Sequence, residues 1–143
     1  MGINVIDMGF LAIKKIAVVL LLGYVGLVII FETFLGIAQP QGGDTMVITS
    51  FEDDGDAFNR VVSRLERGSQ VFVAVNHWPR AWARRIRRNP NVQITYDGGT
   101  IDYRAVLLEG SDHDDVSSNF PVPIAFRFLT GFPSRYFFRF DLE

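Results

Sequence analysis

A long apolar run near the N-terminus constrains the fold of this chain more than any other feature. Residues 16–31 contain no charged or strongly polar side chain, and the run continues through Glu32 and Thr33 to Ala38. A bilayer core of about 30 Å needs about 20 helical residues, and residues 16–38 meet that length. The rest of the chain is too small to surround a helix that is apolar on every face. We therefore predict one transmembrane helix in an N-terminal segment, residues 1–38.

Two lysines, Lys14 and Lys15, directly precede the run and decide how it is interpreted. They could be the charged region of a cleaved signal peptide, with residues 36–38 as the small-residue cleavage site. They also bear on topology, because the next basic residue after the run is Arg60. The positive-inside rule then places the N-terminus in the cytoplasm and the remaining domain outside.

Glu32 is a carboxylate near the outer end of the predicted span. One interpretation is a side chain at the level of the lipid headgroups. The other is a contact with a second membrane protein, because ionisable groups within a membrane usually face protein rather than lipid.

A short linker, residues 39–44, separates the anchor from a domain that covers residues 45–143. The linker reads Gln-Pro-Gln-Gly-Gly-Asp and contains the residues that interrupt regular structure. The chain carries a net charge of −2, which does not indicate bulk attraction to nucleic acid. Its lack of cysteine fits either side of a membrane.

Alternating apolar residues and turn signals predict an α+β domain with about six strands, mostly joined by hairpins. The stretch from residue 70 to residue 75 is apolar almost throughout, so we expect it to be covered on both faces. The predicted architecture is a small closed or split β-barrel with helices at its rim. The expected strands cover residues 46–50, 59–65, 70–75, 92–96, 100–108 and 136–142, and the expected helices cover residues 80–88, a segment capped by Ser111, and residues 124–129.

One stretch of the domain carries a family pattern. Residues 71–82 read Val-Phe-Val-Ala-Val-Asn-His-Trp-Pro-Arg-Ala-Trp, residues 89–92 read Asn-Pro-Asn-Val, and residues 103–106 read Tyr-Arg-Ala-Val. This resembles the deazaflavin-dependent nitroreductase and quinone reductase family, relatives of the flavin-binding split barrels, here in a membrane-anchored form. That family shows a strand, an Asn-containing turn, Pro-x-Trp opening a helix, and Asn-Pro-x-Val before the next strand. The resemblance covers roughly residues 46–142.

The resemblance implies a split β-barrel, a deazaflavin or FMN cofactor, and hydride transfer to quinones or nitro compounds. In such a site the cofactor carries the redox chemistry, and the protein holds its phosphate and orients its ring. Arginines and the free amides of a helix N-terminus are the groups that bind phosphate. The expected cofactor-binding residues are Arg60, Asn76, His77, Trp78, Arg80, Trp82 and Arg84.

The loop before Arg60 departs from the family pattern. Family members carry a basic, glycine-containing loop there, whereas residues 52–60 read Glu-Asp-Asp-Gly-Asp-Ala-Phe-Asn-Arg and match only at Gly55 and Arg60. The four acids of this loop would repel a phosphorylated cofactor tail. The sequence therefore also allows a domain that binds no cofactor.

Two functional hypotheses follow. The first is a membrane-anchored flavin or deazaflavin reductase acting near the bilayer on quinone-like or nitro compounds, with its catalytic residues unassigned. The second is a non-catalytic accessory subunit of a membrane protein complex, in which a cofactor-free split barrel serves as a binding module. In either case the lipid bilayer is a partner, and the expected partner or lipid contacts are Glu32, Arg88 and Phe132.

Two other kinds of site lack support in the sequence. There is no cysteine and no Ser-centred elbow, so nucleophilic catalysis is not indicated. His113 lies among aspartates, but these are not at the spacing of metal ligands, and we expect no metal site.

Overall fold

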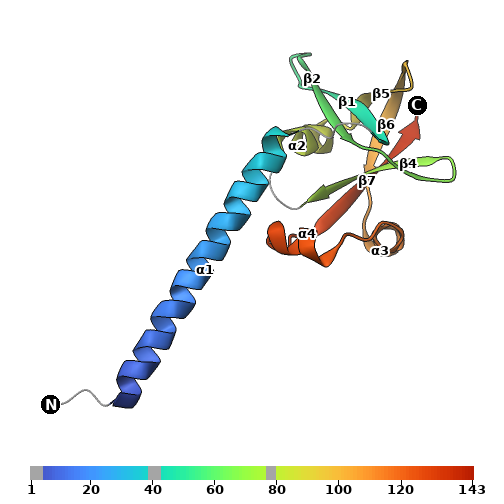
Figure 1. Ribbon diagram of the computed structural model, residues 1–143. Helices are drawn as coiled ribbons and strands as arrows, with labels where there is room; N and C mark the ends of the chain where they lie inside the picture. Colours follow the sequence, from blue (N-terminus) through green and yellow to red (C-terminus); the bar gives the residue numbers. More distant parts are fainter. Residues whose placement is uncertain (1–4, 39–42, 77–79) are drawn as a thin grey trace.

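The computed structural model describes residues 5–38, 43–76 and 80–143, and shows one long helix leading into a small β-rich domain (Figure 1). The long helix is α1 (Val5–Ile37). Its stretch Gly9–Ile37 is long and apolar enough to cross a membrane, which agrees with the predicted anchor. Most of this helix extends away from the domain.

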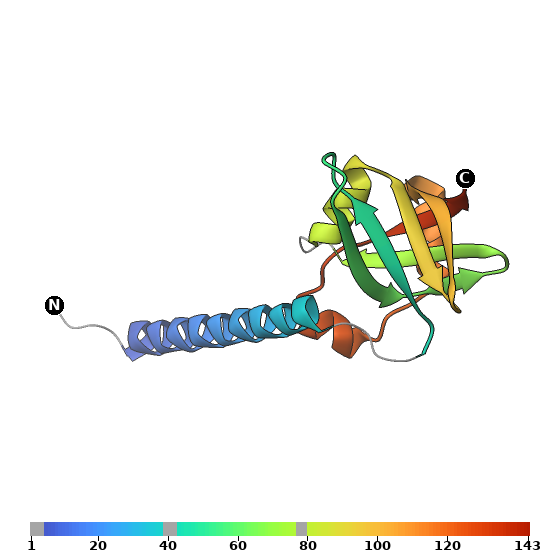
Figure 2. The same cartoon turned by 90° about the horizontal axis from the view of Figure 1, so that it is seen from above.

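The domain is built on one antiparallel sheet of seven strands in the order β2-β1-β5-β6-β7-β4-β3. The sheet curls, so that its two end strands approach each other without pairing (Figure 2). This confirms the predicted α+β split barrel, with one strand more than expected, because the chain breaks at Arg64 and turns one long strand into two. The strands are β1 (Thr45–Phe51), β2 (Ala57–Ser63), β3 (Leu65–Arg67), β4 (Gln70–Asn76), β5 (Asn91–Tyr96), β6 (Gly99–Leu107) and β7 (Arg135–Leu142).

The barrel core follows the two-residue period of its strands. In β1, alternate side chains point inward, and Met46 and Ile48 are buried there. They pack with Ile94 of β5 and Phe138 of β7 in one cluster. The helix α2 (Ala81–Arg88) closes one end of this core by burying Ile86 in the same cluster.

Strand β4 is covered on both faces, as its continuous apolar sequence predicts. Val73 belongs to the barrel core, whereas Phe72, the preceding residue, belongs to a second cluster with Val116 and Phe137. Val116 comes from α3 (Gly110–Asn119), which packs against β7 on the outside of the barrel. The expected cap at Ser111 is wrong: the cap position is Glu109, two residues earlier, and the helix begins at Gly110, whose φ of 56° turns the chain there.

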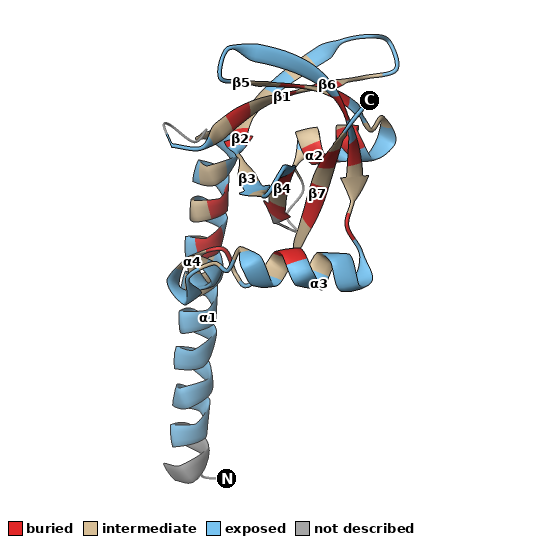
Figure 3. Ribbon diagram, turned by 90° about the vertical axis from the view of Figure 1, so that its right-hand side faces the viewer, coloured by how far each residue is buried: buried red, intermediate tan, exposed pale blue. Residues whose placement is uncertain are grey.

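The membrane helix packs on the domain along one face of its C-terminal part. Tyr24, Val28, Phe31 and Leu35 recur at helical spacing and are partly or fully buried. Figure 3 shows that the buried and intermediate residues of α1 lie in the part of the helix next to the domain. The short helix α4 (Ile124–Leu129) lies beside them. The ring of Tyr24 stacks 4.8 Å from that of Phe128, and Phe31 meets Phe126 edge-on at 6.0 Å. The domain is therefore docked on α1.

Candidate functional site

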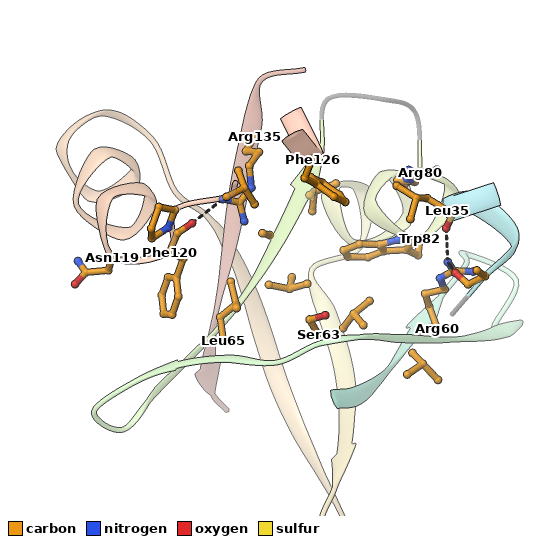
Figure 4. A pocket seen from close by; sticks show the side chains of 18 residues that line it. Leu35, Arg60, Ser63, Leu65, Arg80, Trp82, Asn119, Phe120, Phe126 and Arg135 are labelled. Atoms are coloured by element: carbon orange, nitrogen blue, oxygen red, sulfur yellow. Dashed lines mark hydrogen bonds between the residues drawn. The ribbon is translucent and has the colours of Figure 1, made fainter. Parts of the chain in front are cut away.

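The main cavity of the described residues lies along the open seam of the barrel (Figure 4). It has a volume of about 730 Å³ and is bounded by β2 and β3, the two end strands of the sheet, and by β4. Its walls are completed by Trp82 of α2, Phe126 of α4 and Leu35 of α1. Its size falls in the range of pockets that enclose a small organic ligand.

Arg60 is held by the C-terminus of α1. Its Nη1 donates to the carbonyl of Gly36 at 3.2 Å, and its Nη2 donates to those of Leu35 and Ala38 at 3.4 and 3.1 Å. The last carbonyls of a helix lack partners within the helix and carry the negative end of its dipole. A cation that donates to several of them at once is a strong helix cap, so Arg60 ties β2 to α1.

Arg80 is held by Glu32 of the same helix. Its Nη2 donates to Oε2 of Glu32 at 2.6 Å, and the two side chains are only 19% and 10% exposed. The partner of this carboxylate is thus an arginine of its own chain. The second oxygen of Glu32, Oε1, is buried and finds no partner among the residues that the structure describes.

The other expected cofactor residues divide into three groups. Trp82 is half-buried and lines the seam cavity, whereas Arg84 lies exposed on the outer side of α2. Asn76 ends β4, with its backbone paired to Arg135. The side chain of Asn76 and the residues His77 and Trp78 lie outside the part of the chain that is described.

The two remaining expected contact residues, Arg88 and Phe132, are exposed and lie apart from the seam cavity. Arg88 is 69% exposed in its side chain and approaches Glu52 at 4.0 Å. Phe132 adopts a φ of 53°, an uncommon backbone conformation for a residue with a bulky side chain.

The acidic loop neutralises part of the arginine-rich helix. Oε1 of Glu52 accepts a hydrogen bond of 2.8 Å from Nε of Arg85. The same guanidinium lies over the ring of Phe58, 3.7 Å from its centroid. Arg85 therefore donates to the acidic loop of residues 52–60, whose negative charge would repel a phosphate.

Arg135 is a cavity residue that sequence reasoning missed. Its Nη1 donates to the carbonyl of Phe120 at 2.7 Å, and burial lowers the pKa of its guanidinium. Its own carbonyl lies 2.9 Å from Nε2 of His113, and this contact, with the Asp114 carboxylate, raises the pKa of His113. The sequence signal for Arg135 was its position directly before the aromatic strand expected at residues 136–142.

Two of the three arginines expected to bind a cofactor phosphate, Arg60 and Arg80, are engaged by groups of the same chain. A phosphorylated cofactor tail needs guanidinium groups with free donors. Arg60 and Arg80 donate instead to the end of α1 and to Glu32, and Arg85 donates to Glu52. The seam cavity, by contrast, has largely aliphatic and aromatic walls that suit an uncharged molecule.

No family model and no curated protein matches this sequence. Solved structures do match its fold. An F420-H2-dependent reductase shares 15% identity with a TM-score of 0.55, and the match covers 73% of this chain and 99% of that one. A pyridoxamine 5'-phosphate oxidase-related, FMN-binding protein from Nostoc punctiforme shares 12% identity, with a TM-score of 0.52 and coverage of 69% and 70%. A heme storage protein from Vibrio cholerae shares 17%, with a TM-score of 0.50 and coverage of 70% and 82%.

The fold is a split β-barrel. At these identities the likeness establishes the architecture alone, and the same barrel is found in proteins named for FMN, for F420-H2 and for heme. Fold by itself does not determine function, so the function has to be argued from the site.

Proposed function

We propose that this protein is a membrane-anchored accessory subunit whose split barrel serves as a binding module for a small, uncharged, quinone-like molecule and works without a phosphorylated cofactor. The observation that carries this proposal is the engagement of Arg60 and Arg80 by α1 and Glu32. These are the strongest phosphate-binding candidates of the site, and both are used to dock the barrel on its anchor.

The ligand class follows from the walls of the seam cavity. Val73, Val75 and Leu65 present aliphatic surface, and Trp82 and Phe120 present aromatic surface. Flat, uncharged rings bury well against such walls. The cavity is bounded on one side by Leu35, near the end of the membrane helix, so a quinone-like molecule could reach it from the lipid.

The membrane topology that goes with this proposal has the N-terminus in the cytoplasm and the barrel on the other side. The two lysines before the span support that direction. A barrel outside the cytoplasm would meet other membrane protein subunits through its exposed surface.

The second candidate is a flavin or deazaflavin reductase that acts on quinone-like or nitro compounds. The volume of the seam cavity favours it, since about 730 Å³ is ample for a ring system beside Trp82. It also has the support of the fold, which occurs in a reductase and in an FMN-binding protein. It requires that the cofactor phosphate be bound by groups other than Arg60 and Arg80.

The test is the content of the seam cavity in protein purified gently from its native membrane. The full chain is denatured, and the released small molecules are identified by absorbance, fluorescence and mass. The accessory-module proposal expects no flavin or deazaflavin, and no binding when FMN is added to the intact protein. A stoichiometric flavin or deazaflavin would overturn it and establish the reductase.

The same preparation tests the ligand class. Solvent extraction should recover a quinone-like molecule from the wild type, and the amount should fall in Val73→Trp, which fills the seam cavity. The variant Ile101→Trp, on the exposed face of β6, is the matched control and should retain the molecule. Equal recovery from both variants would contradict binding in the seam.

A further inference from the structure

The stretch of α1 between its two lysines and the domain is too short to span a bilayer. Between Lys15 and Tyr24, the first residue covered by the domain, lie eight residues, or about 12 Å of helix. A hydrocarbon core of about 30 Å needs about 20 residues. Counted from Lys15, that core extends to about Leu35, well into the part of α1 that packs on the domain. Any element that packs beside α1 between Lys15 and Leu35 therefore lies within the hydrocarbon core.

The element at that depth is α4. The hydroxyl of Tyr24 donates to the carbonyl of Phe128 at 3.0 Å, and the ring of Phe31 contacts Phe126. Figure 3 shows α4 beside the C-terminal half of α1, below the barrel. Three bulky apolar side chains of this segment remain about half exposed or more: Ile124, Phe128 and Phe132 are 68%, 47% and 48% exposed. In water such a cluster is unfavourable, whereas in lipid it is expected.

Backbone carbonyls near the end of α4 also have hydrogen-bond partners, as a segment in hydrocarbon requires. In hydrocarbon, carbonyls without partners at a helix end are costly. The carbonyl of Phe126 accepts from the amide and hydroxyl of Thr130, and that of Phe128 accepts from Tyr24 and from the amide of Gly131. The carbonyl of Arg127 accepts from the amide of Phe132.

From these observations we propose that the segment 124–132 is inserted in the lipid bilayer beside α1, so that the barrel lies directly on the membrane surface. The occupant of its apolar face is lipid acyl chain. Arg127 is the one charged residue of the segment; it is exposed, and its flexible side chain can extend to the headgroup phosphates. The mouth of the seam cavity at Phe126 and Leu35 then faces the lipid boundary. This inference depends on the membrane anchoring in the proposed function but not on the ligand.

The test is site-directed spin labelling of the full chain in phospholipid vesicles. The chain contains no cysteine, so single cysteines can be introduced without other changes. Ile124→Cys reports on α4, Leu20→Cys on the bare part of α1, and Asp102→Cys on the exposed hairpin of the barrel. Each nitroxide is measured for collision with oxygen, which concentrates in lipid, and with a water-soluble nickel complex. Ala125→Cys is a second label on α4 in case the first variant folds poorly.

We expect the label at residue 124 to show the oxygen-dominated pattern of residue 20, and the label at residue 102 to show the reverse. A nickel-dominated pattern at both residues 124 and 125, with residue 20 still in lipid, would overturn the insertion of α4 and leave the anchor intact. A nickel-dominated pattern at residue 20 would overturn the anchor, and the insertion with it.

Discussion

The guanidinium of Arg80 donates to the carboxylate of Glu32 across 2.6 Å, joining the membrane helix to the residue that opens α2. Both side chains are largely buried, so each neutralises a charge that would be costly alone. Together with the contacts of Arg60 to the end of α1, this pair fixes the barrel on its anchor. Two of the arginines expected at a cofactor phosphate, Arg60 and Arg80, are thereby engaged by α1.

Removal of either partner of this pair should destabilise the docked domain. Glu32→Gln leaves a buried guanidinium without its counter-charge, and Arg80→Met leaves a buried carboxylate. In a double-mutant cycle on thermal unfolding in nanodiscs, we expect a coupling energy of about 1–3 kcal/mol between the two positions. Arg84→Met, on the exposed side of α2, is the control and should change stability by less than about 0.5 kcal/mol. Additive effects of the two substitutions would contradict the pairing.

Loss of Arg60 should fray the end of α1. The amide of Ala38 donates to the carbonyl of Phe34 at 2.7 Å, and its exchange with solvent reports on the last turn. In Arg60→Met we expect this amide to exchange at least about tenfold faster, because hydrogen bonds from a charged group stabilise by about 1.5–3 kcal/mol. Arg60→Lys should give an intermediate rate, since an ammonium lacks the planar fork that reaches several carbonyls. An unchanged rate in Arg60→Met would contradict the cap.

The register of the barrel predicts opposite outcomes for two paired isoleucines. Ile94 and Ile101 are direct neighbours on β5 and β6, but Ile94 is fully buried and Ile101 is 44% exposed. Ile94→Ala should lower the free energy of unfolding by about 2–5 kcal/mol, because it opens a cavity in the core. Ile101→Ala should cost well under about 1 kcal/mol. Chemical denaturation of both variants distinguishes them, and similar losses would mean that the strand pairing is wrong.

Most of the fold was predictable from the sequence, because its signals are local. The strands around Ile48 and Ile94 follow a two-residue alternation, and Asn89 with Pro90 ends α2 as expected. The site was predictable only in part. Arg60, Arg80 and Trp82 do come together at the seam, but their partners do not follow from sequence spacing.

Long-range contacts explain the rest of the difference. Glu32 and Arg80 are 48 residues apart, and only the docking of α1 on the barrel makes them a pair. Arg135 enters the cavity through the pairing of β7 with β4, which no local pattern reveals.

His113 should make stability depend on pH. Its contact with the carbonyl of Arg135, and then with the Asp114 carboxylate, raises the pKa of its imidazole above the usual value. A group with a raised folded pKa contributes stability that is full below its unfolded pKa of about 6.5 and is lost as the pH rises through the folded pKa. The difference in Tm between the wild type and His113→Asn should thus be larger near pH 5.5 than near about pH 8.5. A difference that is constant, or larger at high pH, would contradict this account.

Proximity cross-linking in the native membrane tests the docking of the barrel on its anchor most directly. Phe31 and Phe126 lie on α1 and α4 with their rings 6.0 Å apart. With both replaced by cysteine in this otherwise cysteine-free chain, a short bifunctional thiol reagent should join them within one molecule before any detergent is added. The pair Val19→Cys and Phe126→Cys, with residue 19 on the bare part of α1, should not be joined. If both cysteines of the first pair react singly and no intramolecular product forms, the barrel is not held by α1, and Arg60 and Arg80 are free to bind a cofactor.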